Sequence, residues 1–331
     1  MNINNLKNTC LIALATTSLL HTNAAFSQQE KYPTKPINYI VPYPPGGPTD
    51  VAGRVLAEAI GKKIDQNIVI ENKSGASGSI GIMQLIRSKP DGYNIAGLAA
   101  PSLTAPFMLE KAPYDLTTDV YPVGVAYITP LVIVVNPRKT PDIKDMKSLA
   151  EAAKKLPQGM NYTTAGVGST AHLAMELIKK DMGVQMTHVP YRGSAPGVTA
   201  LLAGDIPVMY SDLVAVLPHI KAGNLRTIAA NTENRLEELP ETPTLAEQGI
   251  QGSKAFSWSG ILAPKDTPDH VINKLTQALE SVLKDTDVQA RLKAVGAYPH
   301  YKNPQNTKNL IAQDSKTWSE VIKANNLKTT N

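Results

Sequence analysis

Short β-branched runs and segments of helical periodicity alternate along most of this chain. The run 37–41 precedes apolar residues at helical spacing over 51–60, and two further runs follow at 67–71 and 94–98. A period that changes from two to 3.6 and back predicts βαβ units, and therefore an α/β fold with a mostly parallel sheet. The alternation returns over 160–230, so a second unit of the same kind is expected.

The length of the chain also suggests two domains, since 331 residues exceed the usual size of one. The extended run 127–135 is expected to leave the first unit, and the Pro-rich segment 232–249 to lead back. The predicted division is domain 1 over 28–135 plus 250–331 and domain 2 over 136–249, with two inter-domain crossings. The tail is expected to be helical, over 268–284, 288–295 and 304–325.

The first residues have the features of a secretory signal peptide, for which 1–27 is the predicted extent. Lys7 precedes an apolar segment, and small residues follow up to Ser27. Cleavage is expected after Ser27, with Ala24 or Ala25 as alternatives. The apolar segment is shorter than the roughly 20 residues that span a bilayer. The one cysteine, Cys10, lies inside this segment, so the mature chain has no thiol chemistry. We expect an exported protein.

Charge and motif content argue against several classes of function. The formal net charge is +5, but Lys and Arg are scattered rather than clustered, which disfavours a nucleic-acid partner. No pair of histidines has the spacing of a metal site, so no metal or other cofactor is expected. No Walker lysine follows either glycine loop, which disfavours nucleoside triphosphates.

The loop between the first strand and the first helix, Val41-Pro-Tyr-Pro-Pro-Gly-Gly-Pro-Thr-Asp50, could hold an anion. Its prolines stiffen the backbone. Gly46 and Gly47 have no side chain that would keep an anion from the backbone N–H groups at the start of the following helix. Thr49 or Asp50 can cap the helix, and the Tyr43 ring could line one side of a ligand site. An ordinary Pro-rich turn remains an alternative.

A second glycine loop opens the repeated unit. The sequence from Gly166 to Ala171 matches G-x-G-x-x-A, the dinucleotide-binding pattern, but the next strand ends at 188–191 without the acidic residue that this pattern needs. A nicotinamide site is therefore not predicted. The bare backbone and the hydroxyls of Ser169 and Thr170 again favour an anion.

A secreted hydrolase is the competing interpretation. Ser169, His172 and Asp212 supply the residue types of a nucleophile, a base and an orienting acid. No G-x-S-x-G elbow surrounds any serine, however. His172 follows Ser169 by three residues on the same predicted helix, and Asp212 lies at the end of a different strand.

Polar residues follow three of the predicted strands, and two of them, Arg192 and Asp212, have two interpretations each. Arg192 could clamp a carboxylate, or could be solvated or paired with Asp50 or Asp212. Asp212 could accept a hydrogen bond from a ligand, or could cap a helix. Ser102 belongs to a small-residue loop, 99–104, where the end of a strand would open toward a ligand.

Taken together, these motifs closely resemble one family, the Bug-type extracytoplasmic solute receptors of tripartite tricarboxylate transporters. The resemblance extends from Tyr32 to about Gly296 and rests on the order and spacing of many short motifs. They include Tyr32-Pro-Thr-Lys-Pro-Ile37, Val41-Pro-Tyr-Pro-Pro-Gly-Gly47, Pro90-Asp-Gly-Tyr93, Tyr162-Thr-Thr-Ala-Gly166, His188-Val-Pro-Tyr191, Gly193-Ser-Ala-Pro196, Leu217-Pro-His-Ile-Lys-Ala-Gly223, Pro243-Thr-Leu-Ala-Glu247 and Ser257-Trp258.

This resemblance implies a periplasmic, two-domain Venus-flytrap binding protein, type II-like, without catalytic activity. It implies a monomer that binds a small carboxylate and delivers it to the membrane subunits of the transporter, or signals through a sensor kinase. In the family, one loop from each domain grips the carboxylate. The residues assigned to ligand binding are Tyr43, Gly46, Gly47, Thr49, Asp50, Ser102, Thr164, Ala165, Gly166, Gly168, Ser169, Thr170, His172, Arg192, Ser194, Ala195 and Asp212.

Two positions depart from the pattern of the family. Ser259 follows Trp258 where many members have an aromatic residue, and Ser211 precedes Asp212 where Asp-Asn is common. A small Ser259 would leave room for a bulkier acid, so the expected ligands are di- and tricarboxylates or an aromatic acid such as terephthalate.

Overall fold

The computed structural model describes residues 31–108, 113–251 and 256–324. Residues 35–331 form one compact unit, and the described part of the segment before it, 31–34, contains no helix or strand. The predicted signal peptide lies outside the described residues. None of the described helices is both long enough and apolar enough to cross a bilayer.

The strands of the compact unit form two sheets, which confirms the α/β class. The six-stranded sheet has the order β11 (Tyr298–Lys302), β4 (Val120–Thr129), β10 (Ser257–Pro264), β3 (Asn94–Leu98), β1 (Ile37–Val41), β2 (Ile68–Asn72). The five-stranded sheet has the order β7 (Met186–His188), β6 (Met160–Thr163), β8 (Val208–Asp212), β5 (Leu131–Val135), β9 (Arg226–Asn231). We call the six-stranded sheet with its helices the six-strand lobe, and the five-stranded sheet with its helices the five-strand lobe.

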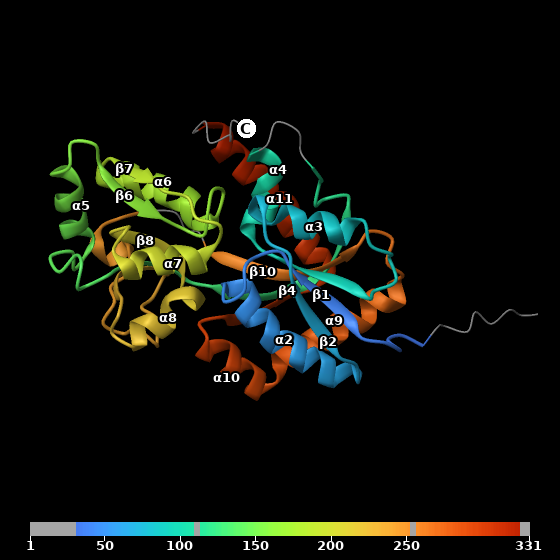
Figure 1. Cartoon of the computed structure of the whole chain (residues 1–331). Coiled ribbons are helices and arrows are strands. Elements are labelled where there is room, and N and C mark those ends of the chain that lie inside the picture. The colour runs from blue at the N-terminus through green and yellow to red at the C-terminus, as the bar shows by residue number, and fades with distance from the viewer. Residues whose placement is uncertain (1–30, 109–112, 252–255, 325–331) are drawn as a thin grey trace, which may run out of the picture. The chain divides into compact units, whose positions relative to one another are not determined.

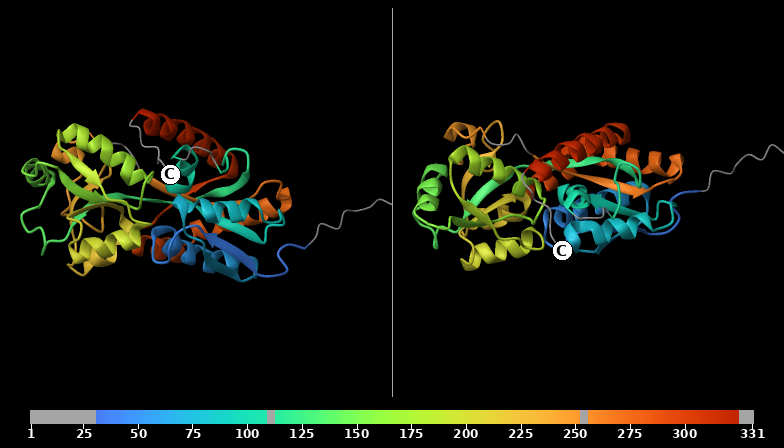
Figure 2. Two further views of the ribbon diagram at one scale, coloured as in Figure 1. Left: turned by 45° about the horizontal axis from the view of Figure 1, so that its top comes forward. Right: turned by 90° about the horizontal axis from the view of Figure 1, so that it is seen from above.

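Helices cover both sheets. In Figure 1, α6 and α7 lie beside the strands of the five-stranded sheet, and α2 lies beside α9. The red helix α11 packs against β4 and α4 (Figure 2). The helices are α2 (Pro48–Ile64), α3 (Ser79–Ile86), α4 (Ala100–Met108), α5 (Met146–Lys154), α6 (Thr170–Met182), α7 (Ser194–Ala203), α8 (Leu213–Lys221), α9 (Asp269–Lys284), α10 (Thr286–Ala294) and α11 (Pro304–Ala324), with short 3-10 turns η1 (Ala76–Gly78) and η2 (Ala246–Gln248).

The expectation of a mostly parallel sheet is wrong. Strand β1 pairs in parallel with β2 and β3, and β6 pairs in parallel with β7 and β8. All of the pairs that β10 and β5 form are antiparallel. A helix that connects two neighbouring strands makes them run in parallel. In the described part of the chain, no α-helix leads directly into β5 or β10, so these strands can run antiparallel to their neighbours.

The predicted extended run 127–135 is two strands that belong to different sheets. Pro130 separates β4 from β5, and β5 pairs with β8 and β9 of the five-strand lobe. Sheet membership therefore places 131–135 with the five-strand lobe. The domain boundaries at 135 and 249 remain predictions, and this pairing favours a first boundary at Pro130.

Other differences come from elements without a strong local pattern. The predicted helical tail is interrupted by β11, and the expected loop 99–104 is the start of helix α4. Strand β10 was not predicted, although it lies between β3 and β4 in the six-stranded sheet. The strand expected to run to Tyr191 ends at His188.

Each lobe has its own apolar core, and a small cluster joins the two. Strand β5 is buried along its whole length because helices cover both faces of its sheet. In the joining cluster, Met108 of α4 and Ile322 of α11 pack with Leu173 of α6. The Thr104 hydroxyl also donates a hydrogen bond to the Gly168 carbonyl, 2.7 Å away. The lobes are therefore in direct contact beside the second glycine loop.

Candidate functional site

One cavity brings together loops from both lobes. Its volume is about 40 Å³, enough for roughly three water molecules. A larger molecule would therefore need the surrounding loops to move apart. The lining consists of Tyr43, Pro44, Gly47, Pro48, Thr49, Ala99, Ala100, Pro101, Thr129, Ala165, Ser169, Thr170, Ala171, Gly193, Ser194, Ala195, Asp212, Ser257 and Ser259.

The starts of five helices meet at this cavity. The first residues of α2, α4, α6 and α7 line it, together with Asp212, the N-cap of α8. Neither α2 nor α7 has a side-chain cap, so N–H groups of their first turns lack a side-chain partner. The lining contains no Lys, Arg or His. Attraction for an anion would therefore come from the backbone N–H groups and dipoles of the helix starts and not from a basic side chain.

Asp50 holds the first loop in place. Its carboxylate accepts hydrogen bonds from the Gly46 N–H (3.0 Å), the Arg54 guanidinium (2.8 and 3.1 Å) and the Asn72 amide (3.0 Å). Asn72 also donates to the Tyr43 carbonyl, 3.1 Å away. Burial raises the pKa of Asp50, but these donors outweigh it and the pKa lies below its ordinary value. Asp50 is thus a support of the loop and does not line the cavity.

Tyr43 and Ser102 form one unit at the edge of the site. The Tyr43 hydroxyl is 2.6 Å from the Ser102 Oγ and accepts a hydrogen bond from the Ser102 N–H at 3.2 Å. Desolvation raises the pKa of Tyr43 above its ordinary value, so the phenol is neutral. Ser102 therefore positions the Tyr43 ring, which lines the cavity.

The second loop is organised by hydroxyl groups. Ser169 caps α6 by accepting from the His172 N–H at 3.2 Å, and its own hydroxyl donates to the Thr164 Oγ1 at 3.1 Å. Thr164 also accepts from the Gly166 N–H, 3.1 Å away. Gly166 and Gly168 have φ values of +126° and +76°, which a side chain rarely adopts. The glycines thus allow the turn, and Thr164 and Ser169 fix it.

A stacked histidine pair lies behind this loop. The ring centroids of His172 and His188 are 4.0 Å apart, with an interplanar angle of 25°. His172 Nδ1 accepts the Gly168 N–H at 3.2 Å, and His188 Nε2 is 2.9 Å from the Thr164 Oγ1. Burial lowers the pKa of His172 to about 4 and, together with the neighbouring His172, that of His188 to about 3. Both rings are therefore neutral near pH 7.

This pair should make the protein sensitive to acid. The unfolded chain binds a proton on each histidine below about pH 6.5, whereas the folded His172 resists protonation until about pH 4. Stability is therefore lost as the pH falls through this window, by up to a few kcal/mol. The variant His172→Asn, whose Oδ1 can accept the Gly168 N–H, should lose about half of this pH dependence. Thermal unfolding at pH 7.5 and 5.0 would measure it, and an unchanged pH dependence would contradict the assignment.

The hydrolase alternative lacks its central contact. A nucleophilic serine needs its hydroxyl within hydrogen-bond reach of a basic imidazole nitrogen. In the structure the Ser169 hydroxyl donates to Thr164, and His172 Nδ1 accepts from the backbone N–H of Gly168. Ser169 and His172 thus act as parts of a loop scaffold.

The structure brings together about half of the predicted site residues in the cavity lining. Those in the lining are Tyr43, Gly47, Thr49, Ala165, Ser169, Thr170, Ser194, Ala195 and Asp212. Those outside it are Gly46, Asp50, Ser102, Thr164, Gly166, Gly168, His172 and Arg192. Except for Arg192, the second group hydrogen-bonds to the two loops or forms part of them.

The two open interpretations at strand ends now have a structural context. Arg192 is exposed and does not line the cavity. Asp212 is the N-cap residue of α8, but its side chain makes no capping hydrogen bond. It faces the cavity instead, where burial raises its pKa to about 6 against the lowering effect of the Ser257 hydroxyl. Direct ligand contact by either residue remains a prediction.

Several lining residues were missed as site residues from sequence. Thr129 and Ser257 come from β4 and β10, whose antiparallel pairing has no local signal. Ser259 of β10 also lines the cavity; from sequence it was connected with the size of the ligand but was not assigned to the site. Ala99, Ala100 and Pro101 lie in the segment that was expected to open toward a ligand, so their strand-end position was a usable signal.

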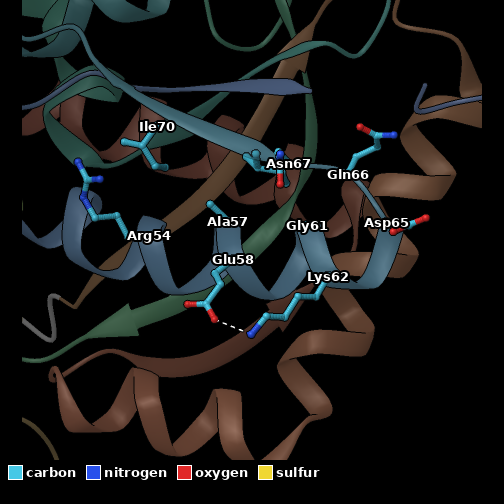
Figure 3. A pocket seen from close by; sticks show the side chains of 10 residues that line it. Arg54, Ala57, Glu58, Gly61, Lys62, Asp65, Gln66, Asn67 and Ile70 are labelled. Carbon is cyan, nitrogen blue, oxygen red and sulfur yellow. Dashed lines mark hydrogen bonds and ion pairs between the residues drawn. The ribbon is translucent and has the colours of Figure 1, made fainter. Parts of the chain in front are cut away.

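A larger and more open hollow of about 750 Å³ lies between α2 and β2 (Figure 3). It shares no lining residue with the cavity described above. Charged side chains border it, including Glu58 and Lys62, which form an ion pair at 2.6 Å. Both side chains are well exposed, as expected for solvated surface charge. This hollow lacks converging helix starts and is a weaker candidate for a ligand site.

Comparison with known proteins agrees with the geometry. The family model "Tripartite tricarboxylate transporter family receptor" matches residues 52–327. Protein BugT of Bordetella pertussis is 34% identical over 302 residues, which cover 91% of this chain and 92% of BugT. The solved periplasmic binding protein BugD is 32% identical with a TM-score of 0.84, covering 90% of this chain and all of BugD. R. palustris Rpa4515 with adipate is 30% identical with a TM-score of 0.84, covering 88% and 98% of the two chains. The chain therefore belongs to the receptor family of the tripartite tricarboxylate transporters.

Proposed function

We propose that the protein is a periplasmic receptor that binds a small carboxylate in the cavity between its lobes and delivers it to the membrane subunits of a transporter. The observation that carries this proposal is the meeting of five helix starts at a cavity without a basic side chain. Such a site holds one carboxylate by N–H groups from both lobes. The adipate in the structure of Rpa4515 belongs to the same chemical class.

Binding should proceed by docking on one lobe followed by approach of the other. The small volume of the cavity, about 40 Å³, supports a step in which the loops separate to admit the ligand. The contact between Thr104 and Gly168 would then break and form again. Hydrogen bonds to a charged group contribute about 1.5–3 kcal/mol each, so three or four give an affinity in the micromolar range, about −8 kcal/mol.

The proposal is tested by calorimetric titration of the purified protein, after removal of bound acids by unfolding and refolding. Adipate, citrate, nicotinate and terephthalate cover the candidate di-, tri- and aromatic carboxylates. We expect one-to-one binding of at least one acid, with no product detected by NMR after prolonged incubation. Hydrolysis of a methyl ester of one of these acids, abolished in Ser169→Ala, would favour the hydrolase instead. Native mass spectrometry of the protein before refolding would identify an acid that co-purifies with it.

A further inference from the structure

Asp212 is the one acidic side chain among the residues that line the candidate cavity, and it is incompletely paired. Its Oδ1 is enclosed and has no hydrogen-bond partner among the described residues. The neighbouring Ser257 hydroxyl lowers the pKa of the carboxyl group, but Oδ1 itself remains without a donor. A buried acceptor without a donor costs about 1–3 kcal/mol. Such a group is expected where a ligand supplies the missing donor.

The backbone around Asp212 is held firmly. Asp212 pairs with Leu131 in the antiparallel ladder between β8 and β5, and the Leu213 N–H donates to the Pro130 carbonyl at 2.9 Å. These contacts join Asp212 to the strands that connect the two lobes. The sheet therefore fixes the backbone of Asp212 beside the cavity, and the carboxylate Oδ1 is enclosed there.

The charges around the cavity limit what can lie beside Asp212. The lining provides no cationic side chain to balance its carboxylate, and Tyr127 and Tyr210 nearby are neutral phenols with raised pKa values. A second carboxylate of a ligand next to an ionised Asp212 would be repelled. A hydroxyl or an ammonium group in the same place would donate to Oδ1.

We infer that Asp212 determines specificity, by accepting a hydrogen bond from a donor group that the carboxylate ligand carries in addition to the carboxylate bound by the loops. The inference rests on the proposed function, because it assumes that the loops hold a carboxylate. It identifies the ligand class as small hydroxy or amino acids. The helix starts recognise the negative charge, and Asp212 recognises the second functional group.

Two matched series of acids test this by calorimetry at pH 7.5. The first is succinate, malate and aspartate, with both enantiomers of the chiral acids, and the second is terephthalate, 4-hydroxybenzoate and 4-aminobenzoate. Within at least one series, a member with a donor should bind about 10- to 100-fold more tightly than the member without one. Preference for the hydroxyl or for the amine distinguishes the two donors.

The variant Asp212→Ala removes both oxygens of the carboxylate and with them the acceptor, whereas asparagine would keep an acceptor oxygen. The alanine variant should reduce the preference to within about threefold, chiefly by weakening binding of the donor-bearing acid. Ser169→Ala is the matched control, because Ser169 also lines the cavity and caps α6. This control should weaken all members of a series by a similar factor.

The outcomes separate the inference from the proposed function. Absence of binding by every acid of both series and of the earlier panel would overturn the proposed function, and the inference with it. Tight binding without a preference for donor-bearing acids, or a preference unchanged in Asp212→Ala, would overturn the inference alone. Thermal unfolding of each variant verifies that it is folded.

Discussion

Gly168→Val should reduce ligand affinity by about 100-fold or more, equivalent to about 2.8 kcal/mol. A Cβ at Gly168 would lie 2.6 Å from the Thr104 Oγ1, which is too close for any real contact. Thr104 belongs to the six-strand lobe and Gly168 to the loop of the five-strand lobe, so the valine should keep the lobes from meeting. The hydrogen bond between Thr104 and the Gly168 carbonyl would also be lost.

A matched glycine separates this collision from backbone strain. Gly249 has the same φ of +76°, but a Cβ there would find no atom within 4 Å. Valine at a positive φ costs about 1–3 kcal/mol of stability at either position. Gly249→Val should therefore lower the melting temperature and leave the affinity unchanged. Wild-type affinity in Gly168→Val would contradict the role of this contact.

A second substitution can test the collision itself. Thr104→Ala removes the atom that the valine would meet, so the double variant Thr104→Ala/Gly168→Val should recover part of the affinity lost in Gly168→Val. Thr104→Ala alone should lose only the contribution of one hydrogen bond, about 1 kcal/mol. Non-additivity in this double-mutant cycle measures the coupling between the lobes.

Asp50→Asn should be the most destabilising conservative change in the site, by about 2–4 kcal/mol. The asparagine keeps the size of the side chain, so no hole is created. Its NH2 group would face donors that now bind a carboxylate, namely the Gly46 N–H, Arg54 and Asn72. Because these contacts hold the first loop, affinity for every carboxylate should fall together with stability. Chemical denaturation and calorimetry would measure the two effects.

The pH dependence of this variant follows from the lowered pKa of Asp50. A carboxyl group with a lowered pKa in the folded state stabilises the protein above its unfolded pKa of about 3.9 and stops doing so as the pH falls below it. The stability difference between wild type and Asp50→Asn should therefore shrink on acidification toward pH 3. Glu58→Gln on the same helix is the control. Its carboxylate is exposed and pairs with Lys62 and Arg291, so its substitution should change the stability only slightly. An equal loss in both variants would contradict the special role of Asp50.

Local chemistry explains what could be predicted from the sequence. The strand-to-helix turns at Gly47 and Gly168 were recognisable because bare backbone, hydroxyls and a helix start follow one another within a few residues. Helix α9 was recognisable from its apolar spacing and begins within one residue of the predicted position. These features depend on neighbours along the chain.

The features that were missed depend on distant parts of the chain. Strand β10 places Ser257 and Ser259 in the cavity by pairing with β3 and β4, which precede it by well over 100 residues. Asn72 binds Asp50 from the end of β2, and the rings of His172 and His188 stack across two separate elements. No periodicity or motif in the sequence indicates such pairings. Residues that hold the two loops in place could therefore be named as site residues, but their structural role could not be predicted.

The absence of Lys, Arg and His from the lining residues has a consequence for how this site can change. Recognition of the negative charge is built into the direction of the main chain, which every substitution of a lining side chain leaves in place. Threonine, serine and aspartate around the rim can then be exchanged to suit a new molecule without losing the attraction common to all acids. The scaffold separates a constant part of recognition from an adjustable one, and Asp212 belongs to the adjustable part.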